Sequence, residues 1–342
     1  MAMELTLGLK QRAAELGFVL SGVTAAAAPG RLQAFHAWLE AGYAGQMSYL
    51  HTRREAYSHP RYVLEGCRSI VMLALPYGPS SRSATTEHAK VARYAQGSRD
   101  YHDVITDKLK LLRTWLLEQQ PQCNVRGVVD TAPLLERELA AAAGLGWIGK
   151  NTLLLNRQWG SYFFLAALLT DLELHSDESD EHSYCGTCTA CLEACPTGAF
   201  PQPFVLDATR CISYLTIEHR GAIDPALQQQ LSGWVFGCDI CQQVCPWNRR
   251  VPENSQPEFA PRDDLQNLDL VELLGLDEAA FRQRFRQTPL WRAKRRGLLR
   301  NAILVAGTKK LPQAHAQLLR LCEDDEELLA QAASWAVSQY AN

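Results

Sequence analysis

The sequence lacks the features of exported and membrane-spanning proteins. Its N-terminal segment, MAMELTLGLKQRAAELGF, has no basic start, apolar core or small-residue cleavage site. No apolar run approaches the ~18 residues of a membrane span, and the longest, Tyr162–Leu169, has the length of a strand. We therefore expect a cytoplasmic protein without a membrane partner.

Motifs for nucleotides and for single metal ions are also missing. The glycine-rich stretch GLGWIGKNT at 144–152 is neither a GxGxxG after a strand nor a phosphate-binding loop. The nine histidines show no H-x-x-H or H-E-x-x-H spacing, which disfavours a His-ligated metal ion. A formal net charge of −3 predicts no attraction of the whole chain to polyanions.

What the sequence does contain is cysteine. There are eleven, and all except Cys67, Cys123 and Cys322 lie between residues 185 and 245. A disulfide framework belongs to an oxidising compartment and would spread its cysteines over the loops that it closes. The clustering therefore indicates metal binding.

The clustered cysteines follow the spacing of a two-cluster ferredoxin. Residues 184–196 read YCGTCTACLEACP, and residues 238–246 read CDICQQVCP. In this pattern the fourth cysteine of a run ligates the other cluster. We predict two [4Fe–4S] clusters, the first held by Cys185, Cys188, Cys191 and Cys245 and the second by Cys195, Cys211, Cys238 and Cys241. A zinc site is the alternative, although zinc needs only four ligands.

Cysteine at every corner leaves no iron open to substrate, so the clusters indicate an electron relay and the chemistry must lie elsewhere. Residues 1–175 alternate helical periodicity with the strand-like runs 69–76, 124–130 and 162–170, which predicts an α/β domain. The acidic stretch 171–184 is typical of a solvated linker and leads into a cysteine-rich domain at 176–260. Short amphipathic helices at 261–342 predict a small helical array.

Three further segments have chemistry-bearing side chains. Asp130 follows a predicted strand in VDTAP, at the edge where open α/β sheets bind ligands; a turn or N-cap aspartate is the alternative. RYAQGSRDYH at 93–102 is more typical of a solvated loop with helix caps. From Arg282 to Lys310 there are ten Lys or Arg residues and no acidic residue, which suits a phosphate backbone and unstacked RNA bases. A solvated helix face balanced by the acidic residues 323–327 is the alternative there.

Taken in order, VDTAP, GWIGKNTLL, the ferredoxin run, CISYLTIEHRG, GCDICQQVCPWN and RRGLLRNA resemble the epoxyqueuosine reductase family of the queuosine pathway. The resemblance implies a cobalamin-dependent enzyme with two [4Fe–4S] clusters that reduces epoxyqueuosine at the tRNA wobble position to queuosine. It implies an α/β corrinoid-binding domain, a ferredoxin-like insert and a C-terminal HEAT-like helical domain. The corrinoid motif D-x-H-x-x-G is absent here, but this family binds its corrinoid without such a histidine.

The resemblance also assigns roles to residues of this chain. Asp130 matches the proton donor of the family. Corrinoid contacts are expected from Arg53, Arg93, Asp130, Lys150, Asn151, Ser213, Cys238 and Asp239. Contacts with the anticodon stem-loop of tRNA are expected from His219, Arg220, Arg292, Lys294, Arg295, Arg296 and Arg300. An external low-potential electron donor would supply the clusters, and we expect a monomer.

Two other functions account for parts of this pattern. A reductive dehalogenase shares the corrinoid and the clusters, but it would carry an export signal, and it would leave the basic tail unexplained. A ferredoxin-type electron-transfer protein would leave the N-terminal domain without a role.

Overall fold

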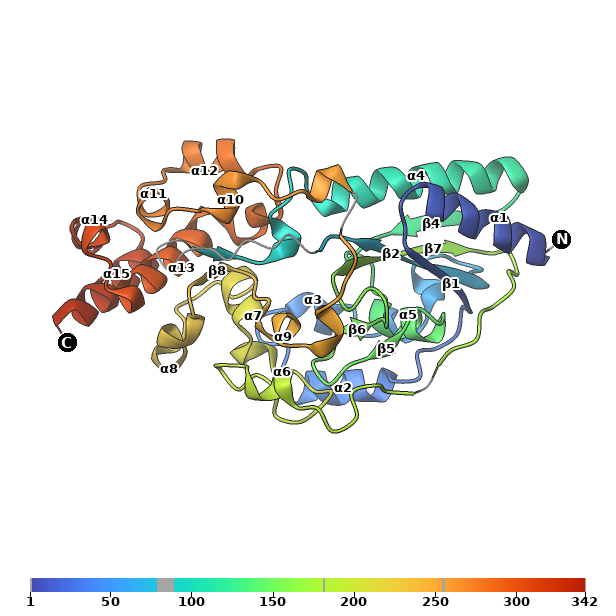
Figure 1. Cartoon of the computed structure of the whole chain (residues 1–342), viewed down its shortest axis with the longest axis horizontal. Coiled ribbons are helices and arrows are strands. Elements are labelled where there is room, and N and C mark those ends of the chain that lie inside the picture. Colours follow the sequence, from blue (N-terminus) through green and yellow to red (C-terminus); the bar gives the residue numbers. More distant parts are fainter. Residues whose placement is uncertain (1, 79–88, 181, 254–255, 342) are drawn as a thin grey trace.

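The computed structural model describes residues 2–78, 89–180, 182–253 and 256–341. Its largest sheet has four strands in the order β1 (Leu20–Ala25), β2 (Ser69–Pro76), β7 (Phe163–Thr170) and β4 (Val125–Val128) (Figure 1). The three predicted strands are confirmed, while β1, which has few large apolar residues, was not predicted. Each neighbouring pair is antiparallel. The argument from parallel sheets therefore does not explain the place of Asp130.

The side chains of β2 pack into two hydrophobic layers, one on each face of this sheet. Val71, Leu73 and Leu75 pack against α1 (Ala2–Glu15) and α4 (Tyr101–Gln119) on one face. The alternate residues Ile70, Met72 and Ala74 pack against α5 (Glu136–Ala142) on the other. Successive side chains of a strand point to opposite faces, so the continuous apolar run 69–76 buries both. Each fully buried large side chain contributes about 1.5–3 kcal/mol.

Short elements cover the face that carries α5. They are α2 (Leu32–Glu40), α3 (Ser48–Thr52), the 3-10 turns Ala56–Ser58 and Pro60–Tyr62, and the hairpin of β5 (Trp147–Ile148) and β6 (Leu154–Leu155). The sequence indicated only a glycine-rich loop where the hairpin lies. In the turn between its strands Thr152 has φ +65°, the left-handed region.

The cysteine-rich segment and the helical tail follow the sheet in the chain and lie at one end of it (Figure 1). The first contains α6 (Ala190–Glu193), α7 (Ile212–Ile217), α8 (Pro225–Gln228), β8 (Trp234–Phe236) and α9 (Ile240–Gln243). The tail contains α10 (Asp263–Gln266), α11 (Leu270–Leu274), α12 (Glu278–Phe285), α13 (Lys294–Lys309), α14 (His315–Leu321) and α15 (Glu327–Ser338). The prediction of a mixed α/β region followed by a helical C-terminus is thereby confirmed.

Two segments connect the region of the sheet with the cysteine-rich segment and the helical tail. β3 (Lys90–Val91) pairs in parallel with β8, so that Ala89–Ala95 share one core with α7 and with the tail helices. The acidic stretch 171–184 is largely exposed, as a linker would be, but it is anchored to the sheet edge. Asp177 accepts a hydrogen bond from the Val23 N–H (2.7 Å) and donates its own N–H to the Val23 carbonyl (2.9 Å). Glu181 of this stretch lies outside the described residues. No helix in the described parts of the chain is long and apolar enough to span a bilayer.

Candidate active site and metal centre

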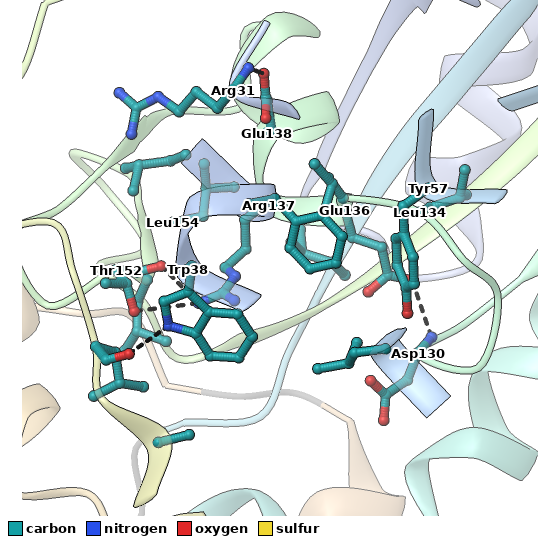
Figure 2. A pocket seen from close by; sticks show the side chains of 18 of the residues that line it. Arg31, Trp38, Tyr57, Asp130, Leu134, Glu136, Arg137, Glu138, Thr152 and Leu154 are labelled. Atoms are coloured by element: carbon teal, nitrogen blue, oxygen red, sulfur yellow. Dashed lines mark hydrogen bonds between the residues drawn. The ribbon is translucent and has the colours of Figure 1, made fainter. Parts of the chain in front are cut away.

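A cavity of about 900 Å³ opens beneath the sheet, between α2, α5 and the β5–β6 hairpin (Figure 2). Its wall is mainly aromatic and apolar and includes Phe35, Trp38, Tyr57, Leu134, Phe163 and Phe164. Five acidic or basic side chains also lie in the wall: Arg31, Asp130, Glu136, Arg137 and Glu138. Such a wall, apolar with a small number of placed polar groups, is typical of a site for a large organic ligand.

Asp130 is held in an unusual backbone conformation at this wall. Its φ is +56°, the left-handed region that few residues other than glycine adopt. The backbone N–H of Asp130 donates to Glu136 Oε1 at 3.0 Å, and the Thr131 N–H donates to the Val129 carbonyl at 2.6 Å. Such strain is kept only where the surroundings impose it, and it is frequent at functional sites. Asp130 is not an N-cap here, so the capping alternative does not describe it.

Two residues from the start of α4 contact the carboxylate of Asp130. The Tyr101 hydroxyl donates to Oδ2 at 2.7 Å, and His102 Nε2 lies 3.3 Å from the same oxygen. His102 Nδ1 lies 2.7 Å from Oδ1 of Asp100, which also caps α4 by accepting the His102 N–H. Both ring nitrogens of His102 therefore face carboxylate oxygens. Each of them can donate a hydrogen bond to its carboxylate only when the imidazole carries both protons.

The pKa values of this group follow from these contacts. The hydrogen bond to His102 lowers the pKa of Asp130, against the effect of burial, and the bond from Tyr101 lowers it further. Burial alone would lower the pKa of His102, but its hydrogen bonds to Asp100 and Asp130 raise it to about 9. At neutral pH the shared proton therefore rests on His102, and Asp130 is ionised. Burial raises the pKa of Glu136 to about 8, so that this carboxyl is neutral.

Arg137 provides a cation in the opposite wall. Its Nη1 donates to the carbonyl of Thr152 at 2.7 Å, and Figure 2 shows the side chain extended from α5 toward Thr152 beside Trp38. Trp38 Nε1 donates to the Leu206 carbonyl at 2.6 Å, which fixes the indole over the cavity. The sequence had given no role to Arg137, Tyr101 or His102. Tyr101 and His102 belong to the segment RYAQGSRDYH, whose sequence predicts a solvated loop with helix caps.

The cysteines gather in two groups beside this cavity. Cys185, Cys188, Cys191 and Cys245 line one smaller cavity of about 270 Å³, together with Lys150, Asn151 and Trp247. Around the others, burial raises the pKa of Cys238 to about 12, and the charges of Cys211 and Cys195 raise it further. Burial also raises the pKa of Cys241 well above its usual value, and the charges of Cys211 and Cys238 raise it further. Among the described residues, no three His, Cys, Asp or Glu side chains are placed to hold a single metal ion.

Three of the predicted corrinoid contacts line a cavity, namely Asp130, Lys150 and Asn151, and the other five line neither. Of these residues, Asp130 lines the large cavity, and Arg53 lies near it, donating to the carbonyl of Thr131 at 3.2 Å. The Arg93 guanidinium stacks over Tyr162 (4.8 Å), and its backbone N–H donates to Asp239 Oδ2 (2.8 Å). Burial raises the pKa of Asp239 to about 6. Ser213 and Cys238 belong to the region around the second group of cysteines.

Lys150 and Asn151 lie beside the cysteines. Both line the smaller cavity. Lys150 Nζ donates to the carbonyls of Gly186 (2.7 Å) and Cys188 (2.9 Å), so it holds the loop that carries the first thiols. Within the same hairpin, Ile148, Thr152 and Leu154 line the large cavity instead.

The basic tail is only partly exposed. Arg220, Arg292, Lys294 and Arg296 are exposed, while His219 and Arg295 are half-buried. Arg292 forms a two-pronged ion pair with Glu218 (3.0 Å and 3.1 Å), and Lys294 lies over the Trp291 ring. Arg296 pairs with Glu326 at 3.1 Å, so the acidic stretch 323–327 does balance part of the basic segment Arg282–Lys310, here called the basic island.

Arg300 does not match the predicted contact with tRNA. It is 1% exposed, and its five N–H groups are directed at neighbours inside the protein. The acceptors are the carbonyls of Leu215, His219 and Gly221 and the side chain of Asn301. Arg300 therefore fixes the 219–221 loop to α13, and leaves the surface to its neighbours.

Comparison with known proteins places this geometry among related enzymes. The family model described as "4Fe-4S double cluster binding domain" matches residues 184–248, and "Epoxyqueuosine reductase QueG, DUF1730" matches residues 58–131. The chain is 40% identical to the epoxyqueuosine reductase of Pseudomonas aeruginosa over 342 residues, covering 98% of this chain and 94% of that one.

Solved structures agree with this match. A crystal structure of epoxyqueuosine reductase with an epoxyqueuosine-modified tRNA-Tyr stem loop superposes with a TM-score of 0.92 at 29% identity, covering 99% of this chain and 91% of that one. The Bacillus subtilis epoxyqueuosine reductase, described with its catalytic aspartate loop swung out of the active site, has a TM-score of 0.91 at 29% identity, with 98% and 90% covered.

Proposed function

This chain belongs to the epoxyqueuosine reductase family, and we propose that it reduces the epoxide of epoxyqueuosine at the wobble position of tRNA to the cyclopentene of queuosine. The observation that carries the proposal is Asp130, an ionisable side chain held at the wall of a large apolar cavity by Tyr101 and His102. The relative solved with a modified stem loop supports a tRNA substrate.

Cobalamin fits the large cavity. The apolar and aromatic wall suits a corrin ring, and none of the residues that line it in the described parts of the chain is a His or Cys that could ligate cobalt. Arg137 in the wall, with Arg53 and Arg93 close by, would hold the polar side groups of the ring. Bound there, the corrinoid would supply the electrons that open the epoxide.

The cysteines would hold the two [4Fe–4S] clusters in the crossed arrangement that their spacing predicts. The set that lines the smaller cavity supports the first cluster. The second is supported by the charge of Cys195, which acts on the pKa of Cys211 and Cys238, and by the charges of Cys211 and Cys238, which act on the pKa of Cys241. The donor set is thiolate alone, which suits iron–sulfur clusters. An external low-potential donor would feed this relay.

The chain's own residues would supply the protons that the reduction of the epoxide consumes. Removal of the epoxide oxygen as water consumes two protons as well as two electrons. Asp130 would protonate the departing oxygen, and it would take the proton from His102 Nε2, 3.3 Å away. Asp100 would keep His102 charged through the 2.7 Å contact with Nδ1.

The basic island would hold the RNA backbone at the mouth of this cavity. The charge of Arg292 is near enough to contribute to lowering the pKa of Asp130, after His102 and Tyr101. Arg220 donates to the carbonyls of Arg292 and Ala293, so these basic side chains form one surface. We propose that Arg220, Arg292, Lys294 and Arg296 contact phosphates while the modified base enters the cavity.

The test is reconstitution. The protein is purified without oxygen, its iron, sulfide and cobalt are measured, and it is then incubated with epoxyqueuosine-containing tRNA, cobalamin and a reductant. Nucleoside mass spectrometry should show queuosine appearing. No turnover from protein with full clusters and bound cobalamin would contradict the proposal, and turnover of an aryl halide instead would favour the dehalogenase alternative.

A further inference from the structure

Asn151 lies in the turn of the β5–β6 hairpin, which forms a wall between the two cavities. Ile148, Thr152 and Leu154 of this hairpin line the large cavity. Lys150, Asn151 and Leu155 line the smaller one, together with four cysteines. Asn151 is therefore a neighbour of the thiols and not of the aromatic wall.

The amide of Asn151 is buried with one half unsatisfied. The side chain is 3% exposed, and among the described residues its Nδ2 has no hydrogen-bond partner. Its Oδ1 accepts the backbone N–H of Leu153 at 3.3 Å, which fixes the orientation of the amide. In the same hairpin Asn156 shows the usual arrangement, since its Nδ2 donates to the Leu145 carbonyl at 2.8 Å.

A buried donor without a partner destabilises the folded protein, so an amide is seldom placed in this way without an acceptor. The Tyr184 hydroxyl in the wall of the smaller cavity is bonded to Asp180, and the other side chains there that can accept are the sulfurs of Cys185, Cys188, Cys191 and Cys245. Lys150 does not compete for them, since its Nζ is bonded to two backbone carbonyls.

We propose that Asn151 Nδ2 donates a hydrogen bond to a sulfur of the cluster held by Cys185, Cys188, Cys191 and Cys245, and that this bond raises the reduction potential of that cluster. The inference rests on the proposed ligands of the first cluster. The added electron increases the negative charge on the cluster sulfurs, so a donor stabilises the reduced form more than the oxidised form. Asn151 would therefore adjust the reduction potential of the first cluster without being one of its ligands.

The experiment is an anaerobic redox titration of the intact protein, followed by electron paramagnetic resonance, which resolves both clusters. Asn151→Leu removes the donor and also the turn acceptor. Asn151→Asp, at about pH 8.5, removes the donor but keeps an oxygen for the Leu153 N–H. In both variants one midpoint should fall, with the reduction equilibrium changing about tenfold, or about 59 mV for one electron. The other midpoint should stay in place and serves as the internal control.

A second measurement does not depend on any variant. After exchange into deuterated water, the reduced wild-type cluster should show an exchangeable deuteron coupled to it by electron–nuclear double resonance, and Asn151→Asp should lose that coupling. Iron and sulfide are measured first, because wild-type protein without clusters would contradict the proposed function and not this inference.

With clusters present, four results would overturn the inference. They are unchanged midpoints, equal shifts of both midpoints, a shift in Asn151→Leu with none in Asn151→Asp, and no coupled deuteron in the wild type.

Discussion

The two cavities on either side of the β5–β6 hairpin differ in the chemistry of their walls. The large cavity is mainly aromatic and apolar, and its Asp130 is linked to His102 and, through it, to Asp100. The smaller cavity is lined by thiols and by the buried amide of Asn151. The proposed proton donor and the proposed ligands of the first cluster thus lie in the walls of different cavities. Each side can therefore be disabled while the other stays intact.

The largest expected effect comes from the electron side. Cys211→Ala removes a proposed ligand of the second cluster, so about half of the iron and sulfide should be lost and turnover should stop, while the Asp130 cavity is unchanged. Metal analysis and nucleoside mass spectrometry check this result. Cys322→Ala, in the tail, is the matched control and should keep both iron and turnover. Full iron in Cys211→Ala would refute the ligand assignment.

On the proton side, Asp130→Asn should lower kcat by roughly 10²–10⁴-fold, the usual worth of a positioned acid. Iron, sulfide and cobalt should stay at wild-type levels, which separates this variant from the previous one. Asp103→Asn removes an exposed carboxylate from the first turn of α4, next to Tyr101 and His102, and should leave kcat unchanged. Equal kcat in Asp130→Asn and wild type would exclude Asp130 as the proton donor.

The pH dependence of kcat tests the source of the proton. The pKa of His102 is raised to about 9, so the proton is present below that pH, and kcat should fall as pH rises through about 9. Asp100→Asn removes a hydrogen bond and a charge that favour the imidazolium. The falling limb should therefore move to lower pH by about one unit, which corresponds to about 1.4 kcal/mol. The titration of His102 by NMR should shift by the same amount, and an unmoved limb would exclude the relay.

The smallest effect is expected at the mouth of the large cavity. Arg292→Ala removes one exposed cation, so the KM for tRNA should rise about five- to tenfold with kcat little changed, and the salt dependence of binding should become less steep by about one ion. Arg320→Ala, an exposed arginine on α14, is the control. If both variants behave alike, the island has no specific contact with RNA.

Much of the fold was open to prediction from the sequence. The run 69–76 has the predicted bounds, because a continuous apolar run is a strong local signal. β1 and the β5–β6 hairpin were missed. The first is poor in large apolar residues, and the second is held by pairs of only two residues per strand.

The candidate site was open to prediction only in part. Asp130 was found through a resemblance, while its partners Tyr101 and His102 lie 29 and 28 residues away in a segment that resembles a solvated loop. Arg300 was grouped with its basic neighbours because charge in sequence does not reveal burial. Its position on α13 turns it inward, where backbone carbonyls take the place of a phosphate.

The sequence by itself determined the cysteine chemistry, because the spacing of ligands within a short loop is a local property that does not depend on where that loop lies. It also determined the basic character of the tail. Only the tertiary structure decided which residues meet Asp130, and that Asn151 faces the thiols while Thr152 faces the large cavity. Those choices depend on how distant segments pack and on which way a turn presents its side chains, and no local pattern encodes either.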